Sequence, residues 1–160
     1  MSDIYGFLDQ HGISYERFRH PPVYTVEQVE ELIPDLPGVK TKNLFLRDRK
    51  GKRHFLVVVP ARQRVDLKAC AQAIGAGKLS FGSEERLKHH LGVDAGSVTL
   101  LGLVNDPEHR VEVFIDRGIW DADKIQCHPL VNTATLTISK RGLETFLGAT
   151  GHSFSVLQVP

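Results

Sequence analysis

Apolar and polar residues change their period several times along the chain, and each change marks a predicted element of secondary structure. Two apolar runs, 44–47 and 54–59, flank the polar segment 48–51, which carries glycine late in the turn. This arrangement predicts a β-hairpin. Similar apolar or alternating runs predict further strands over 13–18, 98–104, 111–116, 134–138 and 154–159.

Helices are predicted where a capping residue precedes a periodic segment and glycine or proline follows it. Ser83 precedes 84–91 and Gly92 follows, so a helix is expected to begin and end there. Strands that form hairpins and are also interrupted by helices favour a mixed sheet with helices packed on it. The expected fold class is therefore α+β (mixed α/β), in a single domain over 1–160. Further helices are predicted over 4–11, 26–32, 67–74 and from 140 to about 147.

The size and composition of the chain are those of an ordinary globular protein. Its 160 residues, 41% of them hydrophobic, suffice to bury a core without disulfides or metals. No apolar run approaches the ~20 residues of a membrane span, and residues 1–5 lack the basic start of a signal peptide. The two cysteines, Cys70 and Cys127, fit a reducing compartment better than a disulfide framework. We therefore expect a cytoplasmic protein that contacts no membrane.

The formal net charge of +1 hides a strong segregation of charge along the sequence. Residues 1–39 carry a net charge of −5, residues 40–90 carry +9 and residues 91–160 carry −3. A concentrated cationic segment is what a phosphate-rich partner selects, because phosphate contacts release counterions and steer encounter. A solvated basic hairpin without a ligand explains the same charges equally well.

Two segments, 40–46 and 128–135, place small polar groups and one proton-active side chain beside an apolar strand. Lys42 in an otherwise apolar run costs free energy to desolvate, so such a residue usually extends to solvent or takes part in chemistry. His128 stands before a proline, which favours an extended backbone at that position. Two such anomalies in a small protein indicate one pocket assembled from distant parts of the sequence.

The ordered motifs of this chain resemble those of trans-acting prolyl-tRNA editing proteins. These are free-standing relatives of the editing domain inserted in bacterial prolyl-tRNA synthetases, the YbaK-like superfamily. The resemblance implies one domain with a curved mixed β-sheet flanked by helices. Leu100 follows Thr99 where the family pattern has a proline, so the backbone near Gly102 is expected to differ slightly. The matching segments are 20–25, 42–46, 78–83, 96–99, 102–106 and 128–135.

The activity implied by this resemblance is hydrolysis of the ester between alanine and the tRNA specific for proline. Such editing at a second site is the known remedy when a synthetic site cannot exclude a smaller amino acid. The resemblance implies no metal and no diffusible cofactor. The implied partner is the acceptor end of mischarged tRNA(Pro), with prolyl-tRNA synthetase as a further candidate. Two alternatives stay open: a deacylase for cysteine, serine or a non-protein amino acid, and a non-catalytic module that binds tRNA or a synthetase.

Three residues are the candidate catalytic groups, on the strength of the same motifs. Lys42 would supply a compact positive charge beside the phosphate or the ester carbonyl. Asn43 would hold a ribose hydroxyl or a water molecule, and His128 would position the ribose or act as a general base. Side chains alternate along a strand, so Lys42 and Asn43 cannot both point into one pocket unless the strand begins after Asn43 or carries a bulge.

Further residues are predicted to contact the substrate or the tRNA. The backbone of 102–105 would approach the aminoacyl end, since glycine permits close approach. A small apolar pocket would exclude proline by its volume. The substrate candidates are Val23, Leu32, Gly102, Leu103, Val104, Asn105, Leu130, Asn132 and Thr133. The tRNA candidates are Lys78, Arg86 and Lys88, with the hairpin cations Arg49, Lys50, Lys52 and Arg53 as further possibilities.

The pair Cys127 and His128 invites a thiol-protease or zinc interpretation, which the spacing does not favour. Adjacent residues of an extended chain point apart, so they do not form a catalytic dyad. Zinc sites need paired ligands at a spacing that the cysteines and histidines of this chain do not show. No metal site is therefore predicted.

Overall fold

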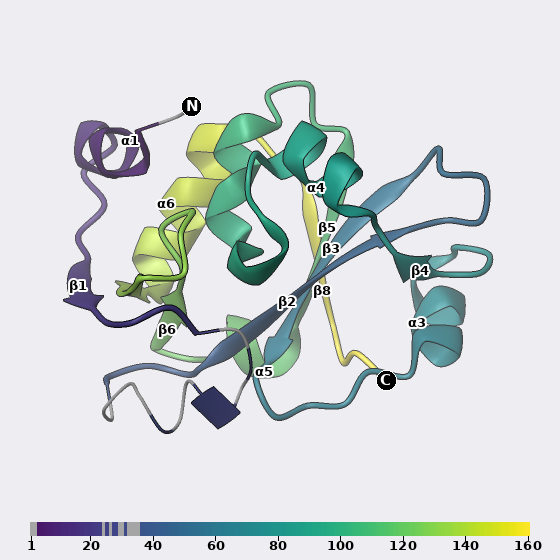
Figure 1. The fold of residues 1–160 in the computed structure, drawn as a ribbon, viewed down its shortest axis with the longest axis horizontal. Coiled ribbons are helices and arrows are strands. Elements are labelled where there is room, and N and C mark those ends of the chain that lie inside the picture. Colours follow the sequence, from purple (N-terminus) through teal and green to yellow (C-terminus); the bar gives the residue numbers. More distant parts are fainter. Residues whose placement is uncertain (1–2, 24, 26, 29–30, 32–35) are drawn as a thin grey trace.

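The computed structural model describes residues 3–160 apart from 24, 26, 29–30 and 32–35. Its strands form two sheets, with helices on both faces of the larger one (Figure 1). The α+β prediction is thereby confirmed. The strands are β1 (Glu16–Arg19), β2 (Thr41–Arg47), β3 (His54–Pro60), β4 (Ser80–Phe81), β5 (Val111–Asp116), β6 (Lys124–Cys127), β7 (Ala134–Ser139) and β8 (Phe154–Leu157). The helices are α1 (Ile4–Gln10), α3 (Leu67–Ile74), α4 (Glu84–Leu91), η1 (Ala95–Ser97), η2 (Leu100–Asn105), α5 (Arg117–Trp120) and α6 (Lys140–Thr150).

The larger sheet has five strands in the order β4-β2-β3-β5-β8. β2 and β3 form the predicted antiparallel hairpin, while β5 pairs in parallel with both β3 and β8. The smaller sheet is antiparallel, in the order β1-β7-β6. A parallel bridge between Val39 and Ile125 joins the two sheets just before β2 begins. This junction brings the start of β2 beside the end of β6.

Capping residues place the helices where the sequence predicted them. The Asp66 carboxylate accepts hydrogen bonds from the first backbone N–H groups of α3, and the Ser83 hydroxyl accepts one in α4. Gly75 and Gly92 end these helices in the left-handed conformation. Of the helix predicted over 26–32, most lies outside the described residues, but Gln28 N donates to Thr25 Oγ1 as a helix cap would.

The strand predicted over 98–104 is wrong, because this segment forms the 3₁₀ helix η2. The Thr99 hydroxyl accepts a hydrogen bond from Leu101 N and so caps the helix. Leu100 and Leu103 are both buried in the core. A short apolar run has the same pattern in a buried strand and in a buried helix, so periodicity alone does not separate them.

Alternate residues of β2 serve two cores on opposite faces of the five-stranded sheet. Phe45 packs with a cluster that includes Leu87 and Leu91 of α4. Leu46 packs with the other cluster, which includes Cys70 and Ala71 of α3. α3 and α4 therefore cover opposite faces, and each β2 side chain belongs to one face or the other.

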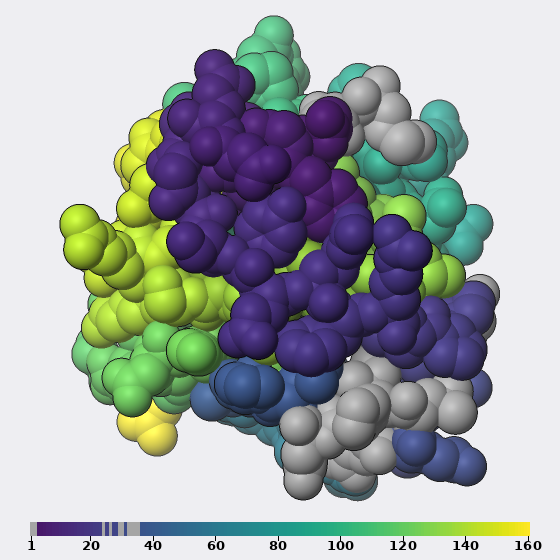
Figure 2. All heavy atoms as spheres, turned by 90° about the vertical axis from the view of Figure 1, so that its left-hand side faces the viewer, coloured from purple at the N-terminus to yellow at the C-terminus, as the bar shows by residue number. Residues whose placement is uncertain are grey.

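The N-terminal segment covers one side of the molecule. Figure 2 shows this segment, in purple, spread over green and yellow-green parts that belong to later elements. Phe7 of α1 meets Phe146 of α6 edge-on, with ring centroids 5.7 Å apart. In the part of the chain that the structure describes, no helix has both the length and the apolar character to cross a membrane.

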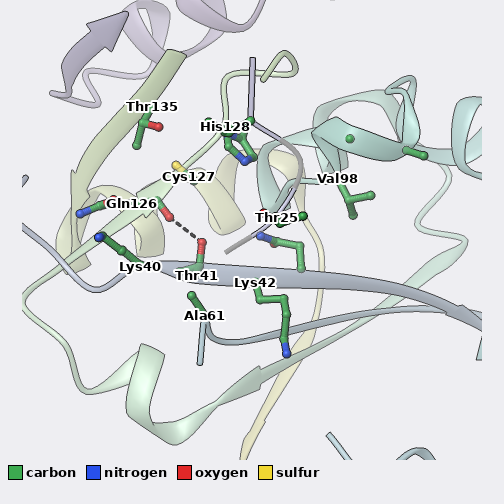
Figure 3. A pocket seen from close by; sticks show the side chains of 14 residues that line it. Thr25, Lys40, Thr41, Lys42, Ala61, Val98, Gln126, Cys127, His128 and Thr135 are labelled. Carbon is green, nitrogen blue, oxygen red and sulfur yellow. Dashed lines mark hydrogen bonds between the residues drawn. The ribbon is translucent and has the colours of Figure 1, made fainter. Parts of the chain in front are cut away.

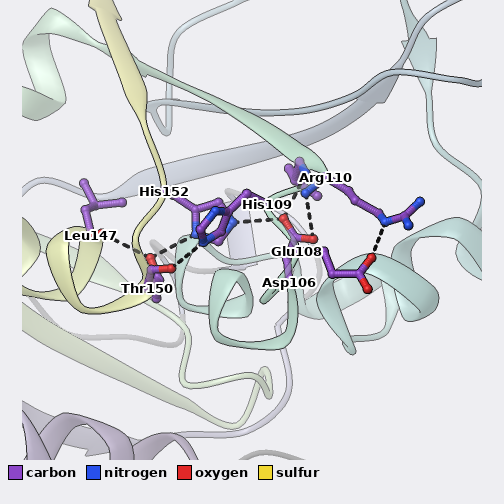
Figure 4. Close-up of polar contacts among 8 residues, drawn as sticks. Asp106, Glu108, His109, Arg110, Leu147, Thr150 and His152 are labelled. Carbon is purple, nitrogen blue, oxygen red and sulfur yellow. Dashed lines mark hydrogen bonds and ion pairs between the residues drawn. The ribbon is translucent and has the colours of Figure 1, made fainter.

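A buried polar network fixes the end of η2 to the end of α6 (Figure 4). His152 Nε2 lies 2.9 Å from Asp106 Oδ2, and His152 Nδ1 lies 3.0 Å from Thr150 Oγ1. The Asp106 carboxylate also accepts backbone N–H groups from Arg110 and Val111. Buried polar groups that are fully hydrogen-bonded specify one arrangement of the segments that they connect.

Candidate active site

A cavity of about 180 Å³ lies where the two sheets meet (Figure 3). The start of β2 forms one wall, and the end of β6 with the start of β7 forms another. Of the predicted catalytic residues, Lys42, Asn43 and His128 all line this cavity. The other lining residues are Val23, Thr25, Lys40, Thr41, Ala61, Ala95, Gly96, Val98, Gln126, Cys127 and Thr135.

Asn43 lies on the face of the sheet that also carries Phe45. β2 pairs with β3 without interruption, Lys42 opposite Val59 and Asn43 opposite Val58, so the strand neither begins after Asn43 nor bulges there. Asn43 Oδ1 is buried and has no hydrogen-bond partner among the residues that the structure describes. A buried polar atom without a partner costs free energy, so an acceptor left open in a cavity suits a ligand that donates a hydrogen bond.

The Lys42 ammonium does not meet the His128 imidazole. Lys42 Nζ donates a hydrogen bond of 2.5 Å to the backbone carbonyl of Gln63, and in Figure 3 the side chain points away from His128. Burial lowers the pKa of the Lys42 ammonium below its ordinary value. Lys42 and His128 therefore both line the cavity. The Lys42 ammonium, however, points away from the His128 imidazole (Figure 3).

Contacts with Ala134 and Thr99 hold His128 in the cavity wall. Its Nδ1 lies 3.4 Å from the carbonyl oxygen of Ala134, and its own carbonyl accepts a hydrogen bond of 2.7 Å from the Thr99 hydroxyl. Burial lowers the pKa of the imidazole, and the neighbouring His20 lowers it further, against the raising effect of the Ala134 carbonyl. The neutral imidazole is therefore favoured, and the tautomer that donates from Nδ1 leaves a lone pair on Nε2.

Polar residues that the sequence analysis did not single out hold the cavity together. Thr41 Oγ1 donates to the carbonyl of Gln126 at 2.5 Å, and Gln126 Nε2 donates to the carbonyls of Leu36 and Gly38. Thr135 Oγ1 lies 2.8 Å from His20 Nε2. Thr135 belongs to the segment 128–135 that the sequence analysis identified. No sequence pattern around Gln126 indicates that its side chain is buried and hydrogen-bonded to a distant segment.

The Cys127 thiol lines the cavity but is not a nucleophile. Burial raises its pKa to about 12, so the reactive thiolate is absent at neutral pH. Among the described residues, no three histidine, cysteine, aspartate or glutamate side chains lie so that they could hold a metal ion.

The predicted apolar substrate pocket is assembled only in part. Val23 lines the cavity, whereas Leu32 lies outside the described residues. Leu130 has a left-handed backbone, with φ of 69°, and packs against the core. Asn132 and Thr133 hold the segment that carries Val23: Asn132 Nδ2 donates to the Val23 carbonyl at 3.1 Å, and the Thr133 carbonyl accepts from the backbone N–H of residue 20.

The predicted substrate residues 102–105 do not line the cavity. They belong to η2, which packs against α4: a Cβ on Gly102 would lie 3.0 Å from the Cβ of Leu91. Leu103 is buried in the core, and Val104 packs against it. Asn105 Nδ2 donates to the Leu91 carbonyl at 2.9 Å. The glycine at 102 therefore permits close helix packing in this structure.

The predicted tRNA-binding cations differ in their surroundings. Lys78 and Lys88 are exposed, and Lys88 Nζ lies 3.4 Å from Asp94. Arg86 is half-buried, and its Nη1 donates to the Gly51 carbonyl at 2.9 Å. Arg86 thereby attaches α4 to the β2–β3 hairpin.

These features define a class of protein: an open α+β domain with a small cavity, lined by polar and apolar side chains, at the junction of two sheets. The particular family follows from comparison with known proteins. The chain belongs to the aminoacyl-tRNA editing domain family, whose model matches residues 20–146.

Two relatives are similar to this chain over most of their length. The chain is 39% identical over 152 residues to the prolyl-tRNA editing protein ProX of Acetoanaerobium sticklandii, covering 95% of this chain and 93% of that protein. It is 37% identical over 153 residues to prolyl-tRNA synthetase associated domain-containing protein 1 of Danio rerio, covering 94% and 83%.

Two solved structures share the fold. One is the crystal structure of a hypothetical protein, with a TM-score of 0.74 and 20% identity, covering 98% of this chain and 97% of that one. The other is of a candidate trans-editing enzyme for prolyl tRNA synthetase, with a TM-score of 0.68 and 16% identity, covering 100% and 99%. At these identities the likeness concerns the fold.

Proposed function

We propose that the chain is a trans-acting deacylase that hydrolyses alanine from mischarged tRNA(Pro), with residues 1–160 acting as one cytoplasmic editing domain. Membership of the aminoacyl-tRNA editing family and the likeness to a prolyl-tRNA editing protein support this proposal. The structural observation that supports it is the position of Asn43 Oδ1. This buried acceptor has no partner among the described residues and lies in the same cavity as His128.

The reaction needs little more than positioning, because an aminoacyl ester is already activated. A water oxygen bonds to the ester carbonyl carbon, the bond from that carbon to the ribose oxygen breaks, and a proton passes to the ribose oxygen. The products are free alanine and tRNA with its terminal hydroxyl restored. The vicinal ribose hydroxyl is well placed to share the proton transfer, so His128 serves chiefly to position the ribose.

Three neighbouring residues have distinct roles in this proposal. The Asn43 amide accepts a hydrogen bond from the substrate, either from its amine or from a ribose hydroxyl. The neutral His128 accepts one through Nε2. On substrate binding, the Lys42 ammonium leaves the Gln63 carbonyl, its partner in the free protein, and turns toward the ester, where it favours the negative charge that develops on the carbonyl oxygen.

The short side chains that line the cavity fit an aliphatic amino acid, and the choice of alanine rests on the family resemblance. Small or branched side chains, Val23, Ala61, Val98 and Cys127, line a space of about 180 Å³. Alanine presents one methyl group to such a space, whereas the proline ring needs more room. We infer that the walls exclude proline by volume, as a second sieve does.

The partner of this activity is the acceptor end of tRNA(Pro). The net charge of +9 over residues 40–90 complements its phosphates. Association with prolyl-tRNA synthetase is part of the proposal, and the name of the Danio rerio relative supports it.

The test is release of radiolabelled alanine from alanyl-tRNA(Pro) by the purified protein. We expect rapid release from this substrate and none above background from prolyl-tRNA(Pro). A panel of cysteinyl-, seryl- and non-protein aminoacyl-tRNAs measures the specificity for the amino acid. Tight tRNA binding with no release from any substrate would instead identify a binding module and refute the enzyme.

A further inference from the structure

Two arginine side chains converge on the turn of the β2–β3 hairpin. A Cβ on Gly51 would lie 2.7 Å from Arg86 Nη2 and 3.0 Å from Arg47 Nη1. The two nitrogens therefore lie at most about 6 Å apart, by the triangle that these distances form. Gly51 has φ of 69°, and its lack of a side chain leaves the space that both guanidinium groups occupy.

Neither arginine forms an ion pair with a carboxylate within the described residues. Arg47 and Arg86 take part in none of the ion pairs there, and the neighbouring Glu84 and Glu85 bond to neither. The Asp48 carboxylate accepts hydrogen bonds from the backbone N–H groups of residues 52 and 53 instead. Two like charges at this separation repel each other, so the arrangement calls for an anion between them.

Arg86 is oriented in advance for such an anion. Its Nη1 donates to the Gly51 carbonyl at 2.9 Å and lies 2.9 Å from Nε2 of His54. Burial, together with the nearby His90 and Arg86, lowers the pKa of His54 to about 4, so His54 is a neutral acceptor for the guanidinium. Arg86 Nη2 faces Arg47, and the Arg47 guanidinium provides a second set of hydrogen-bond donors.

Arg47 also lies on the same strand as the cavity residue Asn43. Asn43, Phe45 and Arg47 are alternate residues of β2 and share one face of the sheet. Four residues of a strand span about 14 Å, which is about four stacked nucleotides at ~3.4 Å each. Because α4 covers Phe45 between the two sites, a nucleic acid with its ester in the cavity must pass around α4 to reach the arginines, and the phosphate that they bind lies at least about four nucleotides from the ester.

We propose that Arg47 and Arg86 form a clamp that binds one backbone phosphate of the tRNA substrate, at least about four nucleotides from the scissile ester. The guanidinium fork matches phosphate oxygens in a bidentate manner, so two forks hold one phosphate in a fixed position. This clamp rests on the proposed function and adds a positioning site outside the cavity. It sets the register of the tRNA on the protein and takes no part in bond breaking.

The test compares Arg47→Gln with the control Lys68→Gln, which removes one exposed charge from α3 on the opposite face of the sheet. The substrates are alanyl-tRNA(Pro) and the alanyl ester of adenosine, which has no phosphate to clamp. Arg47→Gln should raise KM for the tRNA about tenfold and leave hydrolysis of the short ester unchanged. It should also reduce the slope of log affinity for tRNA against log salt by about 0.7 to 0.9. Lys68→Gln should change either KM less than twofold.

Arg47→Lys separates the clamp from charge alone, because lysine keeps the charge but loses the fork. We expect it to recover less than half of the lost affinity. Equal losses on both substrates, or equal effects of the Arg47 and Lys68 variants, would overturn the clamp. If neither substrate is hydrolysed by the wild-type protein, the proposed function fails, and the clamp is then judged by the salt dependence of tRNA binding alone.

Discussion

Lys42 and Asn43 are consecutive in β2 and point to opposite faces of the five-stranded sheet. The Lys42 ammonium reaches the Gln63 carbonyl, while the Asn43 amide carries a buried oxygen that has no partner in the described part of the chain. Both residues nevertheless line the cavity that contains His128. One strand thus contributes a charge from one side of its backbone and an open hydrogen-bond acceptor from the other, and the two roles are separable by mutation.

Replacement of Asn43 should separate activity from stability. In Asn43→Leu, we expect kcat/KM for alanyl-tRNA(Pro) to fall about 10- to 100-fold, since an acceptor for the substrate is lost. The free energy of unfolding should stay level or rise by up to about 1 kcal/mol, because a buried oxygen without a partner is removed. Kinetic assays and urea unfolding measure the two quantities.

Thr41→Val is the matched control for Asn43, because its hydroxyl is bonded within the fold, to the Gln126 carbonyl. This variant should lose about 1 kcal/mol of stability and retain more activity than Asn43→Leu. A large loss of stability in Asn43→Leu would contradict the view that its amide is kept for a ligand.

Lys42→Ala tests whether the ammonium acts on the reaction or only fastens the chain. We expect deacylation to fall at least about 100-fold, because a desolvated charge near the ester stabilises the developing oxyanion strongly. Binding of uncharged tRNA should change little. The bond to Gln63 offers the opposite account: if the lysine only fastens that loop, Lys42→Ala unfolds more easily yet deacylates normally, a result that would remove Lys42 from the site.

The pH profile should report a neutral His128. Burial lowers the pKa of this imidazole, so it stays unprotonated at pH values where an ordinary histidine is half charged, near 6.5. We expect kcat/KM to be level down to that pH and to fall only below it. In His128→Gln the rate should drop about 10- to 100-fold, and the acid limb assigned to His128 should vanish. A wild-type inflection above pH 7 would show that burial does not govern this group.

The sequence predicts the secondary structure well where local chemistry determines it. Ser83 and Gly92 bound α4 as expected, because a cap and a left-handed glycine act over a few residues. The error at 98–104 has a different origin: Leu100 and Leu103 are apolar in either conformation, and only packing against α4 selects the helix. Gln126 was missed because its partners, Leu36 and Gly38, lie some 90 residues away in the sequence.

The composition of the site was predicted better than its geometry. Motifs from both ends of the chain do supply one cavity, in which Asn43 and His128 lie together. The sequence alone left open how Lys42 and Asn43 could both point into one pocket. The uninterrupted pairing of β2 with β3 places the two side chains on opposite faces of the sheet. The distance from 102–105 to the cavity could not be foreseen, since it follows from the misassigned strand.

The Asp106–His152 network should govern stability in acid (Figure 4). Burial alone would raise the pKa of the Asp106 carboxyl, but the hydrogen bonds from His152 and from the backbone of Val111 and Arg110 outweigh burial and lower it. A carboxyl with a depressed folded-state pKa stabilises the fold fully above the pKa of an unfolded aspartate, about 3.9. That contribution is lost as the pH falls through the lower value of the folded state.

Asp106→Asn should therefore cost about 2–4 kcal/mol at pH 7, because it replaces a buried charge that accepts several hydrogen bonds. The difference from wild type should shrink below about pH 4, as the wild-type carboxylate becomes protonated. The control is Glu108→Gln, which removes an exposed ion pair with Arg110 and should change stability by less than about 0.5 kcal/mol. Urea unfolding at pH 7 and pH 3 measures both variants. A difference for Asp106→Asn that is the same at the two pH values would mean that its charge contributes nothing, and that the network acts through shape and neutral hydrogen bonds.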